Sequence, residues 1–178
     1  MAEQTQPSRK APKKPEPPRD VVSAPREDVG ALPPRIAALR TKILEAVATR
    51  DLENLRIPIE WNEVPPIFER GTRKGPGFDP LDMLKTRSFD GNGREMMAIL
   101  QAVMEAPYVV VKRGPFETYV WPAFAVVPPK DPDEKTRLHM LRCIRFADLG
   151  LTNSAGGPLI HNVRIGPDGT WHTFMPDS

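Results

Sequence analysis

The chain has 178 residues, of which 39% are hydrophobic, enough for one domain of ordinary size plus a segment poor in large apolar side chains. Its 25 lysines and arginines nearly balance 23 aspartates and glutamates, and this net charge of +2 argues against nucleic-acid binding, which normally requires a basic surface. No apolar run is long enough to predict a membrane span, and the single cysteine, Cys143, excludes an internal disulfide.

Residues 1–32 predict a disordered, proline-rich, basic tail or linker. Proline lacks a backbone donor and disfavours helix in the residue before it, and the segment has little to bury. We interpret it as a solvated spacer. The alternative is an interaction arm in which Arg9-Lys10 and Lys13-Lys14 contact an anionic surface. Residues 33–178 are expected to form a single domain.

The domain is expected to begin with a helix at Pro33-Pro34, because proline suits the first helical turn. Hydrophobic residues then recur at helical spacing and indicate a buried face: Ile36, Leu39, Ile43 and Val47. Asp51 predicts the cap of a short second helix, Leu52–Arg56. The stretch Ile57–Trp61, which contains a proline, is expected to be extended or looped, and Gly71–Gly77 to be an exposed loop.

Three further helix starts are predicted by capping residues or by strong periodicity. Asp79 and Pro80 form a cap and first turn, and Arg94–Glu105 has the broadest apolar stripe in the chain. The methionines of that stripe are more typical of a core than of an adaptable partner groove. The segment Asp131–Glu134 predicts the last helix, with three side chains directed inward: Leu138, Leu141 and Ile144.

Two β-hairpins are predicted. Tyr108–Lys112 and Glu117–Trp121 are rich in β-forming residues and are separated by a turn. A terminal hairpin is predicted within Ile160–Phe174, around the turn Pro167-Asp168-Gly169. This turn is expected to set Ile165 opposite Trp171 and Val163 opposite Thr173, with Arg164 and His172 on the other face. The fold class is therefore α+β, with about four helices packed on a small antiparallel sheet that includes the C-terminal hairpin.

Metal binding and nucleophilic catalysis are both weakly indicated. His139 and Cys143 are four residues apart and would share a helix face, with His161 or His172 as a third ligand. No matched second pair accompanies them, and a cysteine in the middle of a helix lacks the positive helix end that activates a thiolate. We expect no metal, no cofactor and no catalytic residue.

The remaining candidates are acidic residues near tryptophans. Glu60 and Glu63 flank Trp61, and Glu117 lies near Trp121. Clusters of aromatic and acidic side chains suit carbohydrate binding or hydrolysis. Our candidates for ligand binding are therefore Glu60, Glu63, Glu117 and Trp121.

Three segments together carry a family resemblance: Arg50–Pro66, Glu117–Ala125 and Ile165–Phe174. They resemble an uncharacterised family of alphaproteobacterial proteins that are often exported, over roughly residues 25–178. The resemblance implies a periplasmic or exported location if a signal peptide has been removed, and a cytoplasmic one otherwise. It implies no activity or catalytic residue. Relatives tend to have a Tyr-Arg pair where this chain has His161-Asn162.

The expected function is that of a non-catalytic binding or cell-envelope-associated module on a proline-rich tether. Its partner would be another protein or an envelope component; the oligomeric state is not predicted. The alternative is a hydrolase that acts on glycan or cell-wall material. A deep pocket containing Glu60, Glu63 or Glu117 together with Trp121 would favour the hydrolase.

Overall fold

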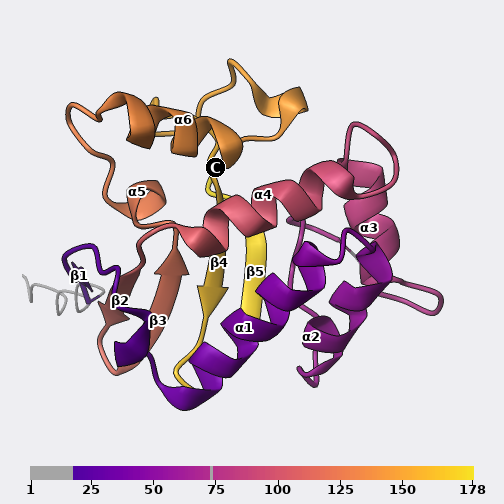
Figure 1. The fold of residues 1–178 in the computed structure, drawn as a ribbon. Helices are drawn as coiled ribbons and strands as arrows, with labels where there is room; N and C mark the ends of the chain where they lie inside the picture. The colour runs from indigo at the N-terminus through magenta and orange to yellow at the C-terminus, as the bar shows by residue number, and fades with distance from the viewer. Residues whose placement is uncertain (1–17, 73) are drawn as a thin grey trace, which may run out of the picture.

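The computed structural model describes residues 18–72 and 74–178 and has the predicted α+β architecture (Figure 1). Its α-helices are α1 (Pro34–Ala48), α2 (Arg56–Glu60), α3 (Pro80–Arg87), α4 (Arg94–Glu105), α5 (Ala123–Val126) and α6 (Glu134–Arg142). Its strands are β1 (Asp20–Val22), β2 (Val109–Arg113), β3 (Phe116–Trp121), β4 (His161–Ile165) and β5 (Trp171–Pro176). Three short 3-10 helices are η1 (Val29–Ala31), η2 (Leu52–Leu55) and η3 (Phe146–Asp148). None of these helices has the length and apolar run that crossing a bilayer requires.

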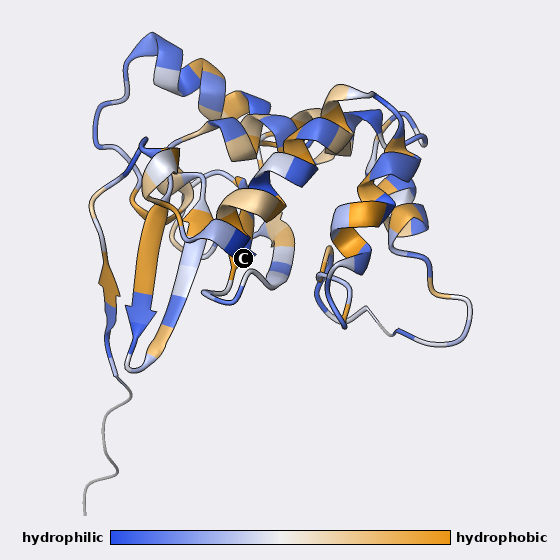
Figure 2. Cartoon of the chain, turned by 60° about the horizontal axis from the view of Figure 1, so that its bottom comes forward, coloured by the Kyte–Doolittle hydropathy of each residue, from blue (hydrophilic) through white to orange (hydrophobic). Residues whose placement is uncertain are grey.

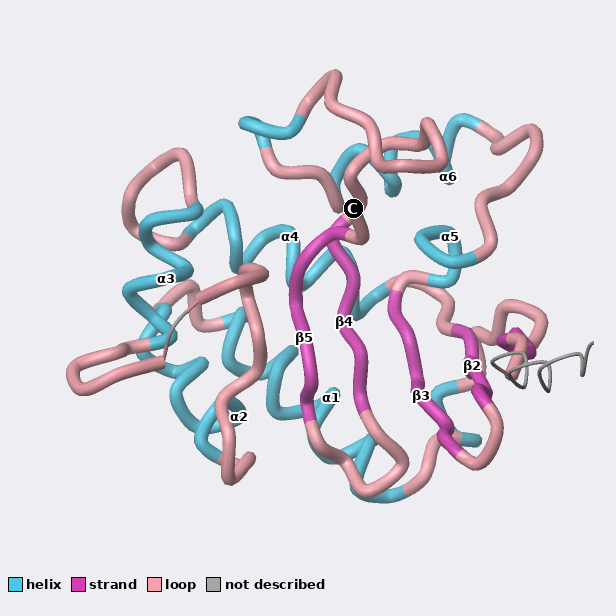
Figure 3. Tube along the Cα trace, turned by 180° about the vertical axis from the view of Figure 1, so that it is seen from behind, coloured by secondary structure: helices cyan, strands magenta, loops and turns pink. Residues whose placement is uncertain are grey.

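The strands form an antiparallel sheet in the order β1-β2-β3-β4-β5, so each strand pairs with the next one in the chain. Helices α1 and α4 lie across one face of the sheet (Figure 1), and the view from behind shows β2 to β5 in front of them (Figure 3). Hydrophobic and hydrophilic residues alternate along the helices (Figure 2), as expected for helices with one buried face.

The main core lies between these helices and the sheet. The predicted buried faces are confirmed for α1, where Ile36, Leu39, Ile43 and Val47 are all buried, and for α4. The buried residues of α4 are Met96, Met97, Ile99, Leu100, Ala102, Val103 and Met104. Its methionines are therefore core residues and not a partner groove.

The predicted boundary between tail and domain at residue 33 is wrong. Asp20 of β1 lies opposite Arg113 of β2, and the two side chains form an ion pair. Arg26 and Tyr108 exchange two backbone hydrogen bonds of 2.8 and 2.9 Å, and Leu32 is buried. All three residues of β1 are exposed, so this strand is held by backbone bonds and an ion pair, which a search for buried apolar residues cannot detect. The rest of the predicted tail, residues 1–17, lies outside the described residues.

The stretch Ile57–Trp61 was predicted to be extended or looped, but most of it belongs to α2. Pro58 is the third residue of this helix, within the first turn, where a missing N–H removes no intrahelical hydrogen bond. The cap before it is confirmed: the Asp51 carboxylate accepts a hydrogen bond of 3.1 Å from the Glu53 N–H.

The last predicted helix is present as α6, but it begins two residues later than the cap-proline-acid signature predicts: Asp133, and not Asp131, is the cap, and it accepts a hydrogen bond from the Thr136 N–H. Two of the three side chains predicted to face inward do not: Leu138 and Leu141 are 56% and 54% exposed, whereas Ile144, just after the helix, packs against the core. The helix is turned so that His139 faces α4, with Nε2 2.6 Å from the Ala102 carbonyl oxygen. That carbonyl is among the last four of α4 and has no partner within the helix, so a polar contact decides the rotation of α6.

The terminal hairpin is confirmed, with Ile165 opposite Trp171 as predicted. A register shift between Arg164 and Ile165 then sets Val163 opposite Phe174, and not opposite Thr173. The extra residue on β5 allows both Trp171 and Phe174 to be buried in the core.

Candidate functional site

The four predicted ligand-binding residues do not form one site. Glu60 ends α2 and Glu63 follows it, whereas Glu117 and Trp121 belong to β3 in the middle of the sheet (Figure 1). Glu63 is exposed, and the Glu60 carboxylate lies 3.8 Å from the Arg56 guanidinium.

The two candidates in β3 are both engaged in contacts within the fold. Trp121 is fully buried in the core, with its ring 5.0 Å from that of Tyr108, so no ligand reaches it. The Glu117 carboxylate lies 3.1 Å from Lys112 Nζ. Hydrogen bonds from Lys112 and Tyr119 lower the pKa of Glu117, the opposite of the shift that a general acid needs.

His139 and Cys143 are also structural. Cys143 is fully buried, and burial raises the pKa of its thiol to about 12, which disfavours the reactive thiolate. His139 contacts the Ala102 carbonyl oxygen of α4 through its ring nitrogen Nε2. Within residues 18–72 and 74–178, no group of three or more His, Cys, Asp or Glu side chains is arranged to hold a metal.

A polar groove of about 610 Å³ lies near the end of α4. Its central charge, Arg40 of α1, donates from Nε and Nη2 to the Met104 carbonyl oxygen, at 3.1 and 2.9 Å. Arg40 and His139 therefore both satisfy terminal carbonyls of α4, where the helix dipole favours positive charge. Among the charged groups of this groove, Arg40 therefore stabilises a helix end.

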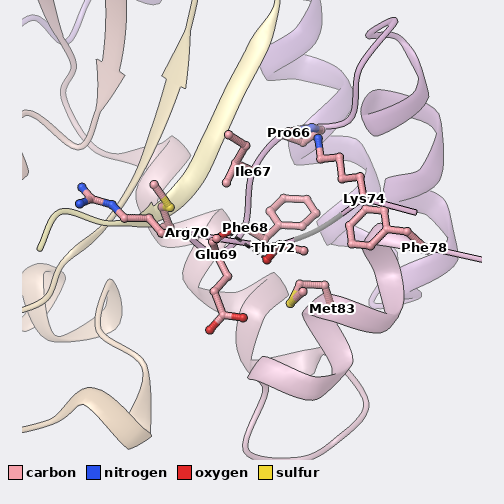
Figure 4. A pocket seen from close by; sticks show the side chains of 11 residues that line it. Pro66, Ile67, Phe68, Glu69, Arg70, Thr72, Lys74, Phe78 and Met83 are labelled. Atoms are coloured by element: carbon pink, nitrogen blue, oxygen red, sulfur yellow. Dashed lines mark hydrogen bonds between the residues drawn. The ribbon is translucent and has the colours of Figure 1, made fainter. Parts of the chain in front are cut away.

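A pocket of about 280 Å³, with mostly apolar walls, lies between α3 and the segment that precedes it. We call it the α3 pocket. Its lining residues are Pro66, Ile67, Phe68, Glu69, Arg70, Gly71, Thr72, Lys74, Phe78, Met83 and Met175. Figure 4 shows the rings of Phe68 and Phe78 and the side chain of Met83 around one space, with Glu69 and Arg70 extending away from it.

The α3 pocket is anchored to the sheet through Ile67. The Ile67 N–H donates to the His172 carbonyl, and the Phe174 N–H donates to the Ile67 carbonyl, each at 2.9 Å. Successive side chains of an extended segment point to opposite sides, so this pairing directs Phe68 into the core. Its ring packs in T-shaped contacts with the rings of Trp171 and Phe174, with centroids 6.0 and 6.3 Å away. One wall of the pocket is therefore fixed by the C-terminal hairpin.

The opposite wall is set by α3 and by the loop before it. The predicted cap is confirmed: Asp79 accepts a hydrogen bond of 3.0 Å from the Leu81 N–H and also pairs with Arg56 at 3.0 Å. These two contacts of Asp79 fix the start of α3, which lies between Phe78 and Met83 in the sequence. Lys74 reaches back and donates to the Pro65 carbonyl oxygen, and burial lowers the pKa of its amine.

A buried polar cluster lies between the end of α3 and the start of β4. Arg87 pairs with Glu69 and Arg145 pairs with Asp148, each at 2.7 Å. His161 is fully buried beside them, and neither ring nitrogen has a hydrogen-bond partner in the described structure. Burial, together with the nearby Arg87 charge, lowers the pKa of His161 to about 3.

We predict that His161 makes the domain sensitive to mild acid. The unfolded chain takes up a proton on His161 as pH falls below its ordinary pKa of about 6.5, and the folded chain does not until about pH 3, so the stability falls across that window. Between pH 7 and 5 this residue alone should reduce the unfolding free energy by about 2 kcal/mol. Urea denaturation at both pH values should therefore show a smaller pH effect in His161→Phe; an unchanged pH effect would refute this assignment.

Comparisons with known proteins do not identify the chain: no protein-family model, no curated protein and no solved structure matches it. Any function must therefore be argued from the α3 pocket and from the surface.

Proposed function

We propose that this protein is a non-catalytic binding module, and that the α3 pocket takes an apolar side chain of a partner protein. The observation that carries this proposal is the composition of the pocket: aromatic and methionine side chains surround about 280 Å³, a space suited to one or two large side chains and small for an extended cofactor. Methionine adapts its shape to different apolar ligands.

The chemistry of the pocket supports binding over catalysis. Glu69, the carboxylate of its lining, is paired with Arg87, and Lys74 is bonded to the Pro65 carbonyl. Among the described residues, neither side chain belongs to a set of nucleophile, base and orienting group of the kind that catalysis uses. The hydrolase alternative depends on acidic residues that lie in separate parts of the fold.

We further propose a cell-envelope location for this module. This rests on the family resemblance carried by residues 50–66, 117–125 and 165–174, and on no feature of the α3 pocket.

The proposal predicts that N-acetyl-phenylalaninamide, a soluble stand-in for a phenylalanine side chain, binds at the α3 pocket. At about −0.3 kcal/mol per heavy atom, its Kd should be about millimolar. We expect NMR of methyl-labelled methionine to show shifts of Met83 and Met175, which line the pocket, during titration. The buried Met96 and Met104 should not move.

Variants separate this site from general surface binding. Phe78→Ala removes a pocket wall and should weaken binding by about fivefold, a typical effect of losing one aromatic contact. Phe116→Ala is the matched control, because this residue is 75% exposed on β3 and does not line the pocket. Equal loss in both variants, or no shift at Met83 and Met175, would contradict the proposed function.

A further inference from the structure

Residues 138–151 gather several large hydrophobic side chains on the surface. This segment contains most of α6, then η3 and the loop after it, and it lies at one end of the molecule, beyond α4 (Figure 1 and Figure 3). Its exposed hydrophobic side chains are Leu138, Leu141, Phe146, Leu149 and Leu151. The exposed ring of Phe89 lies 5.8 Å from that of Phe146 and extends the same surface. We call these six residues the α6 face. Apolar side chains gathered in one part of a surface mark an interaction site, whereas single scattered ones do not.

The packing of α6 fixes the exposure of its leucines. On the inner side of the helix, His139 contacts the Ala102 carbonyl oxygen, and Met140 and Cys143 pack against the core. Leu138 and Leu141 are three residues apart and therefore share the outer side. Because the helix is already folded and packed, a partner meets both leucines in place, and binding loses less conformational entropy.

The apolar area of the α6 face matches one half of a homodimer interface. At roughly 120 Å² for a whole leucine and 200 Å² for a whole phenylalanine side chain, its exposed fractions sum to about 500 Å². One partner of a stable complex contributes about 800 Å², of which about 65% is non-polar in homodimers, or about 520 Å². The α6 face is therefore large enough for a folded partner.

The charges around the α6 face are balanced, which disfavours a bilayer as the partner. Residues 130–148 contain five lysines and arginines and four aspartates and glutamates. Two of the arginines are paired, Arg137 with Asp131 at 3.2 Å and Arg142 with Glu105 at 3.6 Å. Attraction to an anionic membrane surface comes from clusters of about four to eight basic residues. A protein surface of mixed charge is the better match.

The order of charges along α6 is complementary to itself. Glu134 lies four residues before Leu138 and Arg142 four residues after it, each roughly 6 Å away along the helix axis. When two copies of α6 pack antiparallel about a twofold axis beside Leu138, Glu134 of each copy lies level with Arg142 of the other. Antiparallel packing also sets the positive end of each helix dipole beside the negative end of the other.

We propose that the α6 face is the interface of a symmetric homodimer, in which a second copy of this chain covers the exposed leucines. In an interface of this symmetry each contact occurs twice, so Leu138 packs against its counterpart and two Glu134–Arg142 pairs form. The α3 pocket shares no residue with the α6 face, so ligand binding in the pocket is a separate property.

Sedimentation velocity of the full-length protein between about 1 and 100 µM tests the dimer, since an interface of this size supports a Kd of about micromolar or tighter. Leu138→Lys brings two positive charges together at the twofold axis. It should weaken the dimer at least about a hundredfold, because the change occurs on both sides of the interface. Ile57→Lys is the matched control: Ile57 is 57% exposed on α2, outside the α6 face, and its variant should keep the wild-type Kd. Thermal melts establish that each variant is folded.

Charge reversal tests the antiparallel arrangement. Glu134→Arg and Arg142→Glu each create like-charged pairs in their own homodimer and should each weaken it by about tenfold or more. In a mixture of the two variants, both pairs again have opposite charges, so a heterodimer should form with a Kd within about threefold of the wild type.

A wild-type protein that stays monomeric at about 100 µM would overturn the proposal. A dimer that survives Leu138→Lys would do the same, and so would a monomer that instead binds phosphatidylglycerol vesicles, which would assign the α6 face to a lipid surface. Failure of the mixed charge variants to associate would overturn the antiparallel arrangement of α6.

Discussion

Trp171→Ala is expected to unfold the domain or to leave it barely folded. Trp171 is 1% exposed, lies opposite Ile165 in the hairpin, and donates from Nε1 to the Thr173 carbonyl oxygen at 2.9 Å. Its ring also meets the edge of Phe68, so it joins the hairpin to the wall of the α3 pocket. Removing a buried tryptophan costs about 3–5 kcal/mol, a large share of a typical total stability of about 5–15 kcal/mol.

His172→Ala is the neighbouring control for this experiment. His172 is exposed and its backbone carbonyl, which pairs with Ile67, is kept in the variant. The expected loss is less than about 1 kcal/mol. Urea denaturation of both variants provides the comparison. A folded Trp171→Ala variant with nearly wild-type stability would show that the hairpin does not close the core.

Deletion of residues 1–32 is expected to destabilise the domain strongly, contrary to the expectation from the sequence. The deletion removes β1, the paired backbone of Arg26 and the buried Leu32. Losing a buried leucine costs about 1.5–3 kcal/mol, and several backbone hydrogen bonds add about 0.5–1.5 kcal/mol each. We therefore expect a loss of at least about 3 kcal/mol.

The matched comparison is a deletion of residues 1–17, which keeps β1 and should change stability by less than about 1 kcal/mol. Differential scanning calorimetry of both proteins measures the difference. Equal melting temperatures for the two deletions would mean that β1 and Leu32 contribute little, and that the domain begins near residue 33 after all.

Much of the fold can be predicted from the sequence because its signals are local. Apolar periodicity places α1 and α4, and an aspartate cap places the start of α3. The Pro167-Asp168-Gly169 turn places the final hairpin. Each of these signals is contained in a few neighbouring residues, and the structure agrees with each.

The predictions from sequence fail where the local structure depends on contacts between distant parts of the chain. β1 depends on backbone pairing with residues about ninety positions away, and the rotation of α6 depends on the Ala102 carbonyl. The register shift in β5 serves the burial of both Trp171 and Phe174, which a regular strand would set on different faces.

The α3 pocket could not be predicted for a similar reason. Its lining comes from a loop, a helix and the last strand, and the loop has no regular pattern of apolar residues. The position of Phe68 follows from the pairing of Ile67 with β5, a contact about a hundred residues apart in sequence. The acidic residues chosen from the sequence do not converge, because Glu60 ends α2 and Glu117 belongs to β3, two separate elements of the fold.

The central claim, that the α3 pocket binds an apolar side chain, is tested most directly by locating the bound ligand. Intermolecular NOEs from the ring of N-acetyl-phenylalaninamide should reach the methyl groups of Met83 and Met175, which line the same cavity. NOEs to the exposed ring of Phe116 alone, or to neither methionine at a saturating ligand concentration, would contradict the claim.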